Sequence, residues 1–357
     1  MSEALTDDAA ESIRLIRESA AAVANPADLK RARAQRYQEP GFDLGVWREI
    51  GELGWIGLAV PEEAGGAGLG MREFCALAEE MGAALVPEPL IPCALSAHLL
   101  ASCPDHGALP QLLTGEMVVV TAWQEAPNTL EAPGTPDAPR LFVPAAAGAD
   151  MVLLPVREGK QLSLYEVQAA GVEITAEGLQ DGGFQGTIRP DLTRAKKLSD
   201  DIGAALSSGL DRAALGTAAM LLGVMDRAFA ITLDYLKTRQ QFGKPIGSFQ
   251  ALQHRAADLK MQVALTRASV EAAAATFDAG ASALACRAAA SRAKHRAAEA
   301  GMLVTRQAIQ LHGGIGYTDE HDIGLYLRKA MVLMNQFGSA ALHRARFMAA
   351  APETHDE

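Results

Sequence analysis

The last third of the chain constrains its fold most strongly. From about residue 202 onward the sequence is rich in alanine and carries apolar residues three and four positions apart, the spacing of one face of an α-helix. Four such stretches follow one another, and none has a proline in its interior. Their expected limits are residues 202–239, 248–280, 282–312 and from about 324 onward. Long helices joined by short links favour an antiparallel four-helix bundle.

Residues at the expected ends support these limits. Ser248 is positioned to be the N-cap of the second helix, because a serine hydroxyl accepts a hydrogen bond from a free backbone N–H of the first turn. Gly313 and Gly314 follow the third helix and would stop it, since glycine readily takes the backbone conformation that ends a helix.

The rest of the chain divides into a helical and a strand-like part. Helical spacing runs from Leu5 to about Pro110, whereas short apolar runs separated by Pro, Gly and Asp lie between Met117 and Thr175. The links between these runs are too short for crossover helices, so we expect a small antiparallel β unit. The prediction is a mainly α protein with a small β domain. Its expected domains are a helical N-terminal domain (1–115), a β middle domain (116–200) and a C-terminal four-helix bundle (201–357).

Composition excludes several classes of partner. The chain has 357 residues, 49% hydrophobic and 21% charged, which is typical of a globular protein. Its net charge of −11 argues against nucleic acid or an anionic membrane as the main partner. Its four cysteines form no CxxC pair, which indicates free thiols, a reducing compartment and no structural metal. The acidic N-terminal residues resemble neither a signal nor a transit peptide, so the cytoplasm is the expected location.

The common catalytic motifs of hydrolases are absent. The chain has no GxSxG, no HExxH and no P-loop. Residues 313–316 read Gly-Gly-Ile-Gly, but Asp319 stands where a dinucleotide-binding motif needs its third glycine, and a helix rather than a strand precedes it. We therefore expect no Rossmann-type site.

The link between the first two bundle helices is more informative. Residues 238–247 combine Arg239, Lys244, Phe242 and two glycines, so a cation could fork onto a phosphate while glycine lets the backbone approach. The alternative is a turn whose cations are only solvated. The acidic run 319–322 has a similar alternative, because negative charge also stabilises the start of a helix. His254 and His295 are expected to be ordinary packed or surface residues.

Two segments, taken together, resemble the acyl-CoA dehydrogenase family. Residues 239–250 read Arg-Gln-Gln-Phe-Gly-Lys-Pro-Ile-Gly-Ser-Phe-Gln, and residues 310–321 read Gln-Leu-His-Gly-Gly-Ile-Gly-Tyr-Thr-Asp-Glu-His. They occur in the family's order, and residues 55–69 match as well, so the resemblance covers nearly the whole chain. That family combines a helical N-terminal domain, a small β domain and a C-terminal four-helix bundle, which is the order predicted here.

The resemblance implies an activity and a cofactor. Members of the family use FAD to desaturate an acyl-CoA thioester between its α and β carbons. By this resemblance Arg239 and Phe242 contact FAD, and Gln310, Gly313 and Gly314 receive its ADP part across a subunit boundary. The resemblance also implies a dimer-of-dimers assembly and an electron-transfer flavoprotein as the electron acceptor.

The chain departs from the family at the catalytic base. Where common members have a glutamate before a Gly-Thr, this chain has Phe337 before a Gly-Ser. Branches with the glutamate on the first bundle helix would place it at Ala213 or Met220, and neither is acidic. Asp211 and Asp226 lie one to two turns away and are the remaining carboxylates that could act as base. The usual base is therefore missing.

The β domain departs as well. The family's Thr-Glu-Pro-x-Ala-Gly-Ser-like segment supplies backbone contacts to the flavin ring, whereas here Thr121 is followed by Ala-Trp-Gln-Glu-Ala and a proline-rich stretch. Thr121 is the retained part of that segment. Both departures fall on the chemistry while the folding and interface segments remain, as expected of a partner subunit. Subunits of bacterial heteromeric acyl-CoA dehydrogenases that degrade steroid side chains resemble this pattern.

Three functions follow from these observations. The chain is an active acyl-CoA dehydrogenase with an unlocated base, a non-catalytic or half-site partner of a paralogue, or a monooxygenase-like relative that uses oxygen chemistry. Homo- and hetero-oligomers both remain open.

Overall fold

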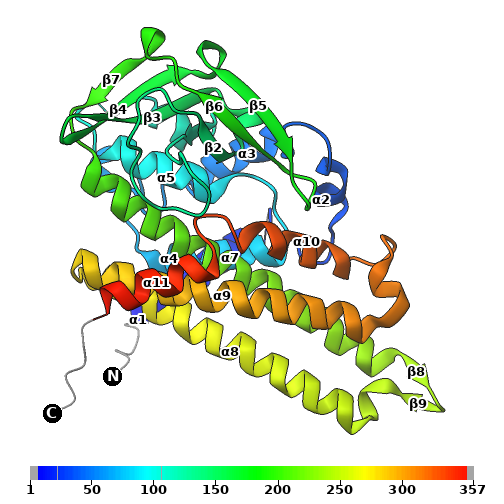
Figure 1. The fold of residues 1–357 in the computed structure, drawn as a ribbon. Coiled ribbons are helices and arrows are strands. Elements are labelled where there is room, and N and C mark those ends of the chain that lie inside the picture. The colour runs from blue at the N-terminus through cyan, green and yellow to red at the C-terminus, as the bar shows by residue number, and fades with distance from the viewer. Residues whose placement is uncertain (1–6, 22, 106, 352–357) are drawn as a thin grey trace, which may run out of the picture. The chain divides into compact units, whose positions relative to one another are not determined.

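The computed structural model describes residues 7–21, 23–105 and 107–351. The chain divides into two compact units (Figure 1). We call Met1–Lys30, Cys75–Val86 and Leu215–Glu357 the bundle unit, and Arg31–Phe74 and Pro87–Ala214 the sheet unit. The expected helical start at Leu5 lies outside the described residues. The predicted domain limits after residues 115 and 200 stay a prediction.

The sheet unit combines short helices with two sheets. Its helices include α3, whose N-cap Asp43 accepts hydrogen bonds from the backbone N–H groups of Gly45 and Val46. The helices in or entering this unit are α2 (Lys30–Gln35), α3 (Leu44–Glu52), α4 (Met71–Ala83), α5 (Leu90–Ala101) and α6 (Leu109–Leu113), with 3₁₀ turns η1 (Glu62–Ala64), η2 (Ala146–Gly148), η3 (Ala169–Gly171) and η4 (Leu192–Arg194). The strands are β1 (Val119–Thr121), β2 (Arg140–Pro144), β3 (Met151–Glu158), β4 (Gln161–Gln168), β5 (Glu173–Gly178), β6 (Phe184–Arg189) and β7 (Lys196–Ser199).

The strands form two sheets, one in the order β1-β3-β4-β7 and the other in the order β2-β6-β5. Most neighbours are antiparallel, as predicted, but β1 and β3 pair in parallel, with Val119 opposite Met151. The expectation of purely antiparallel pairing rested on short links. It fails for this pair because the chain leaves β1, contributes β2 to the other sheet and returns as β3, which leaves room for a parallel partner. The last three strands are too polar on their exposed faces to stand out in the sequence.

The bundle unit is built around α9 (Ala283–His312), which packs against α8 (Gln250–Asp278), α10 (Ile323–Leu333) and α11 (Ala340–Ala350). The unit also holds α1 (Asp7–Ala20), most of α7 (Gly203–Thr238), the small hairpin of β8 (Gln240–Gln241) and β9 (Lys244–Pro245), and the 3₁₀ turns η5 (Ile246–Ser248) and η6 (Gly313–Tyr317). Nine of the fifteen buried residues of α9 are alanine, serine or glycine, and these small side chains let neighbouring helices approach closely.

The helix ends confirm some predictions and correct others. Ser282 is the N-cap of α9, and Gly313 ends that helix with a positive φ of 67°. Ser248 is not the N-cap of α8, because its Oγ donates to the carbonyl of Pro245 at 2.8 Å and the helix begins two residues later. The expected fourth helix is broken into α10 and α11, because Phe337 and Gly338 between them have positive φ values of 53° and 99°.

Helix α7 is long and apolar enough, by length and composition, to cross a membrane. However, 78% of its most apolar window is buried in the structure, as is usual for a core helix.

Gly223 provides a test of the bundle packing. A Cβ added to Gly223 on α7 would lie 1.8 Å from the carbonyl oxygen of Glu79 on α4, so the two helices need a residue without a side chain here. We expect Gly223→Ala to lower the free energy of unfolding by at least about 1–3 kcal/mol. Gly203→Ala is the control, because its nearest neighbour is a flexible carboxylate oxygen at 3.3 Å. Urea unfolding followed by circular dichroism measures both variants, and equal stabilities would contradict the packing seen here.

Candidate functional site

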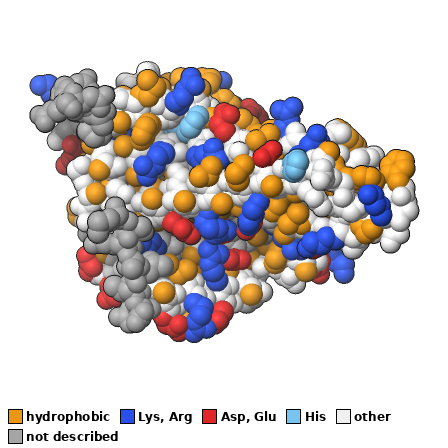
Figure 2. All heavy atoms as spheres, turned by 90° about the horizontal axis from the view of Figure 1, so that it is seen from below, with side chains coloured by type: hydrophobic (Ala, Val, Ile, Leu, Met, Phe, Trp, Pro, Cys, Tyr) orange, Lys and Arg blue, Asp and Glu red, His pale blue; other side chains and the backbone are white. Residues whose placement is uncertain are grey.

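The β8–β9 hairpin projects its predicted contact residues into solvent. Phe242 is 89% exposed and Arg239 is also exposed. Phe242 and Gly243 have φ values of 53° and 78°, so the hairpin turns tightly at its tip. Figure 2 shows hydrophobic side chains at the right-hand end of the molecule, where Figure 1 places this hairpin. An exposed aromatic side chain next to an unburied guanidinium indicates a surface that is completed by another molecule.

The second predicted segment lies at the same end of the bundle. The ring of Tyr235, at the end of α7, stacks on the ring of His312, at the end of α9, with centroids 4.4 Å apart. Directly after His312, Gly313 and Gly314 are exposed, and no heavy atom lies within 4 Å of an ideal Cβ at either residue. Gln310 is exposed as well. The geometry therefore brings the predicted Arg239 and Gly313 segments to one end of the bundle unit.

An aromatic cluster that was not predicted from the sequence joins these two segments. His312 donates from Nδ1 to the carbonyl of Ala308 at 2.8 Å, its Nε2 is buried without a hydrogen-bond partner, and burial lowers its pKa. The ring of His321 lies 4.6 Å from that of His312. These residues become neighbours only because the C-terminal ends of α7 and α9 lie side by side in the bundle, so no local sequence pattern indicates them.

Thr121 is not free to present its side chain. It is buried at the end of β1, and its Oγ1 shares a hydrogen bond of 2.9 Å with Oγ of Ser96. The segment that follows folds onto itself. Glu125 accepts hydrogen bonds from the backbone N–H groups of Gly134 and Thr135 and pairs at 2.7 Å with the fully buried Arg140. These N–H groups, which an anion or flavin would otherwise attract, are already satisfied within the chain.

The positions expected for the base are apolar and buried. Ala213, Met220 and Phe337 are 4%, 4% and 7% exposed. The backbone at Phe337 is also held, because its carbonyl accepts a 2.7 Å hydrogen bond from Nε2 of His343. No proton-accepting side chain is available at any of these three positions.

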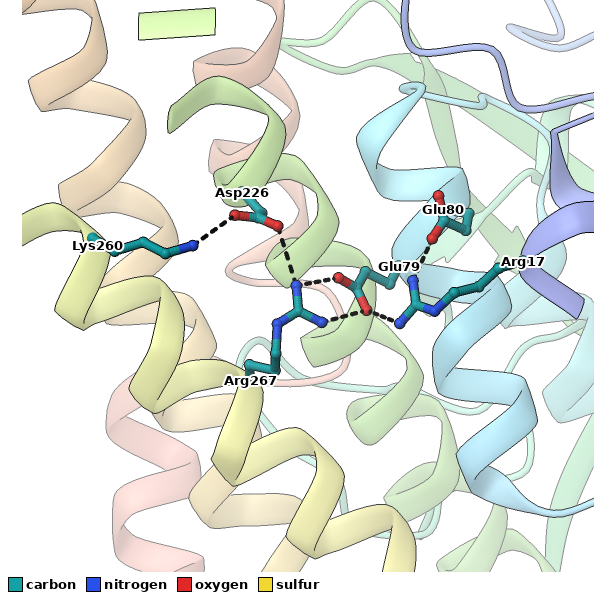
Figure 3. Close-up of polar contacts among 6 residues, drawn as sticks. All are labelled: Arg17, Glu79, Glu80, Asp226, Lys260 and Arg267. Carbon is teal, nitrogen blue, oxygen red and sulfur yellow. Dashed lines mark hydrogen bonds and ion pairs between the residues drawn. The ribbon is translucent and has the colours of Figure 1, made fainter. Parts of the chain in front are cut away.

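The two remaining carboxylates differ in their surroundings. Asp226 accepts from Arg267 at 3.1 Å and lies 3.9 Å from Lys260 (Figure 3). Arg267 also forms a bidentate pair with Glu79 at 2.5 and 3.0 Å. The network continues from Glu79 to Arg17, so Asp226 serves as one part of a structural ion-pair cluster that ties α1, α4, α7 and α8 together. Asp211, in the sheet unit, is 3% exposed.

A small cavity lies beside Ala213 within the sheet unit. Its volume is about 30 Å³, which is room for a water molecule or two. Most of its lining is apolar, and His98 and Arg212 add polar groups. His98 lies 2.9 Å from Oγ of Ser208, and burial lowers its pKa to about 4, so this imidazole is neutral near pH 7. Sites for small-molecule ligands usually offer about 300–1,000 Å³, so this cavity does not admit an acyl group.

Comparisons with known proteins show to which family this chain is similar. The model of the acyl-CoA dehydrogenase N-terminal domain matches residues 10–104, and that of the C-terminal domain matches residues 203–351. The acyl-CoA dehydrogenase IpdE2 of Mycolicibacterium smegmatis is 35% identical over 90% of this chain and 92% of its own length. The chain belongs to the acyl-CoA dehydrogenase family.

Solved structures confirm the predicted fold class. The structure of a Tcur3481-Tcur3483 steroid ACAD variant has a TM-score of 0.84 and 30% identity, and the match covers 96% of each chain. The ChsE4-ChsE5 complex from Mycobacterium tuberculosis has a TM-score of 0.83 and 26% identity, and covers 99% of this chain and 100% of its own. The fold is therefore that of an acyl-CoA dehydrogenase, with a small β region and a C-terminal helical bundle.

FAD is the cofactor of this family, and the residues present fit it in part. The exposed Arg239, Phe242 and Gln310, with the open glycines 313 and 314, suit the adenine and diphosphate part, because an arginine fork and an unobstructed backbone are what a phosphate pair needs. The sheet unit fits the flavin ring less well, since Thr121 and Glu125 are committed to bonds within the chain.

Because buried His343 donates a hydrogen bond to the carbonyl of Phe337, we expect the free energy of unfolding to depend on pH. Burial lowers the pKa of His343 from 6.5 to about 3, and the charge of Lys294 adds to this shift. The unfolded chain therefore binds more protons between these two pH values, so stability is lost as the pH falls through this window. His343→Gln keeps a donor toward the Phe337 carbonyl but cannot take up this proton. Between pH 6.5 and 4 we therefore expect the free energy of unfolding to fall by on the order of 3 kcal/mol less in His343→Gln than in the wild type.

Urea unfolding at steps of half a pH unit measures this loss. His254→Gln is the control, because His254 is exposed on α8. Parallel stability curves for the wild type and His343→Gln would show that His343 does not titrate as the structure implies.

Proposed function

We propose that this chain is a subunit of a heteromeric, FAD-dependent acyl-CoA dehydrogenase in which a related partner chain supplies the catalytic carboxylate. The reaction is the α,β-desaturation of an acyl-CoA thioester. Removal of the weakly acidic α-proton needs a placed base, and FAD supplies the hydride acceptor when it is bound. In this assembly this chain binds and positions part of the FAD, and the partner chain carries the catalytic base.

The observation that carries the proposal is Phe337. It stands where common members of the family have their glutamate, it is buried, and its backbone is pinned by His343. The alternative positions Ala213 and Met220 are equally apolar. Asp226 forms an ion pair with Arg267 at 3.1 Å and lies 3.9 Å from Lys260, so its carboxylate is engaged within the chain. A chain with this arrangement keeps the fold of a dehydrogenase without a carboxylate at any of the three positions expected for the base.

The contribution of this chain to the cofactor site is at one end of the bundle unit. We propose that Arg239, Phe242, Gln310, Gly313 and Gly314 bind the ADP part of an FAD whose flavin ring lies in the partner. The exposure of these five residues supports this, because an isolated chain has no reason to leave Phe242 in water. The closed Glu125–Arg140 loop supports it as well, since it replaces the flavin contacts expected in this chain.

The relatives suggest the class of substrate. The names of the solved structures include a steroid ACAD and the ChsE4-ChsE5 complex, which is an assembly of two chains. We propose a bulky, steroid-type acyl-CoA as the substrate and an electron-transfer flavoprotein as the electron acceptor. The 30 Å³ cavity beside Ala213 agrees with an acyl site that is supplied by the partner.

The visible absorbance of the purified protein tests the proposal. We expect the chain expressed alone to be colourless, even after incubation with excess FAD, and the chain co-expressed with its neighbouring acyl-CoA dehydrogenase paralogue to be yellow. Anaerobic addition of steroid-type acyl-CoA should bleach only the pair. Stoichiometric bleaching of the lone chain would overturn the proposal and establish a self-sufficient dehydrogenase. Rapid reoxidation by oxygen with a substrate that is not a thioester would instead support monooxygenase-like chemistry.

Arg239 tests the shared cofactor site. We expect Arg239→Gln to weaken FAD binding to the pair about tenfold or more, because it removes charge-assisted hydrogen bonds to phosphate. Turnover per bound flavin should change little, since Arg239 is distant from the proton transfer in this assignment. Arg255→Gln is the matched control, because Arg255 is exposed on α8 outside the hairpin. Titration of the apo pair with FAD measures the affinity, and equal affinities for both variants would remove Arg239 from the site.

A further inference from the structure

The loop between α10 and α11 is held in an unusual backbone conformation. Phe337 and Gly338 have φ values of 53° and 99°, and left-handed backbone at a bulky residue is strained. An alanine at position 338 would place its Cβ 2.8 Å from Nε2 of His343. Such a conformation persists only where surrounding contacts impose it.

Lys294 on α9 is one source of that constraint. Its side chain is fully buried, and its Nζ donates to the carbonyls of Met334 at 3.0 Å and Gly338 at 2.8 Å. No carboxylate among the described residues pairs with it. A buried ammonium without a counter-charge is costly, because two carbonyl dipoles replace its hydration only in part.

The other groups around the loop add positive charge. On α11, His343 donates to the Phe337 carbonyl, and Arg346 donates to Oγ of Ser291 at 3.4 Å, next to His343. On α9, His295 lies 3.0 Å from the carbonyl of Ala340. The charges of Lys294, Arg346 and His295 all act on His343. Helix α10 contributes only the carbonyl of Met334 at its end. Among the residues that the structure describes, the loop carbonyls thus bond or face cations and potential cations, and no carboxylate pairs with Lys294.

We propose that the α10–α11 loop is a proton-coupled latch, which opens when Lys294 takes up a proton and moves its amine into water. In the closed state the neutral amine donates its two N–H groups to the carbonyls of Met334 and Gly338. In the open state the hydrated ammonium is stable, and the backbone of Phe337 is released. On opening, the Lys294 amine takes one proton from solvent and forms one new N–H bond. No other covalent bond forms or breaks, and the two hydrogen bonds to the carbonyls are replaced by hydrogen bonds to water.

The direction of the pH dependence follows from linkage. Burial lowers the pKa of Lys294 from 10.5 to about 7. Between these values the open state binds one more proton than the closed state, so opening becomes easier as the pH falls from 10.5 toward 7. The slope is about tenfold in the opening equilibrium per pH unit. His343 is neutral throughout this window, because its pKa is lowered to about 3. The latch does not depend on the proposed function, since it concerns only the loop and its own side chains.

Hydrogen exchange of the loop amides tests the latch. In the full chain, deuterium uptake by peptides covering residues 334–340 is measured by mass spectrometry from pH 7.5 to 9.5 and corrected for the intrinsic exchange rate. We expect the protection factor of the wild type to fall about tenfold for each pH unit downward. Lys294→Met should abolish this slope, whatever its effect on the absolute protection. Peptides from α8 should show no such slope.

Two further comparisons keep the test decisive. Lys237→Met is the control, because Lys237 is an exposed lysine at the end of α7, and it should retain the wild-type slope. Lys294→Gln keeps donors for the two carbonyls but has no titratable amine. It replaces Lys294→Met if that variant does not fold, and we expect Lys294→Gln to lack the slope as well. A corrected protection factor independent of pH in the wild type, or a slope that survives in either Lys294 variant, would overturn the proposal.

Discussion

Close packing of small side chains along α9 is the constraint on which the bundle unit depends. Nine of its fifteen buried residues are alanine, serine or glycine. A Cβ added to Gly301 would lie 3.2 Å from a side-chain carbon of Leu221 on α7. Helices that approach this closely cannot shift without steric overlap or voids. The position of α9 therefore determines where the Gly313–Gly314 turn at its end and the buried Lys294 along it lie.

Ion pairs inside both units engage several carboxylates within the chain. In the bundle unit, Glu79 and Asp226 share Arg267, and in the sheet unit Glu125 is held by Arg140. Each ion pair holds its carboxylate against a partner within the chain. These carboxylates are engaged within the chain, whereas Phe242 at the tip of the β8–β9 hairpin is 89% exposed.

Much of the fold could be predicted because the relevant signals are local. The period of the apolar residues located α7, α8 and α9, and Ser282 and Gly313 marked the two ends of α9 correctly. The prediction failed where two local solutions compete. Ser248 has the chemistry of an N-cap, but its hydroxyl bonds backward to Pro245. The break between α10 and α11 has no proline to announce it, and it depends on contacts from Lys294 and His343 that are distant in sequence.

The sequence by itself determined the order of helices, strands and helices, the two motifs that identify the family, and the absence of an acid at position 337, because each depends only on residue type and short-range spacing. The tertiary structure decided which of the remaining polar residues are available. Asp226 and Thr121 looked usable in the sequence, yet packing commits one to Arg267 and the other to Ser96. It also placed Lys294, which pairs with no carboxylate in the described part of the chain, beneath the strained loop. Such properties arise from burial and from neighbours brought together by folding, which no linear pattern of residues records.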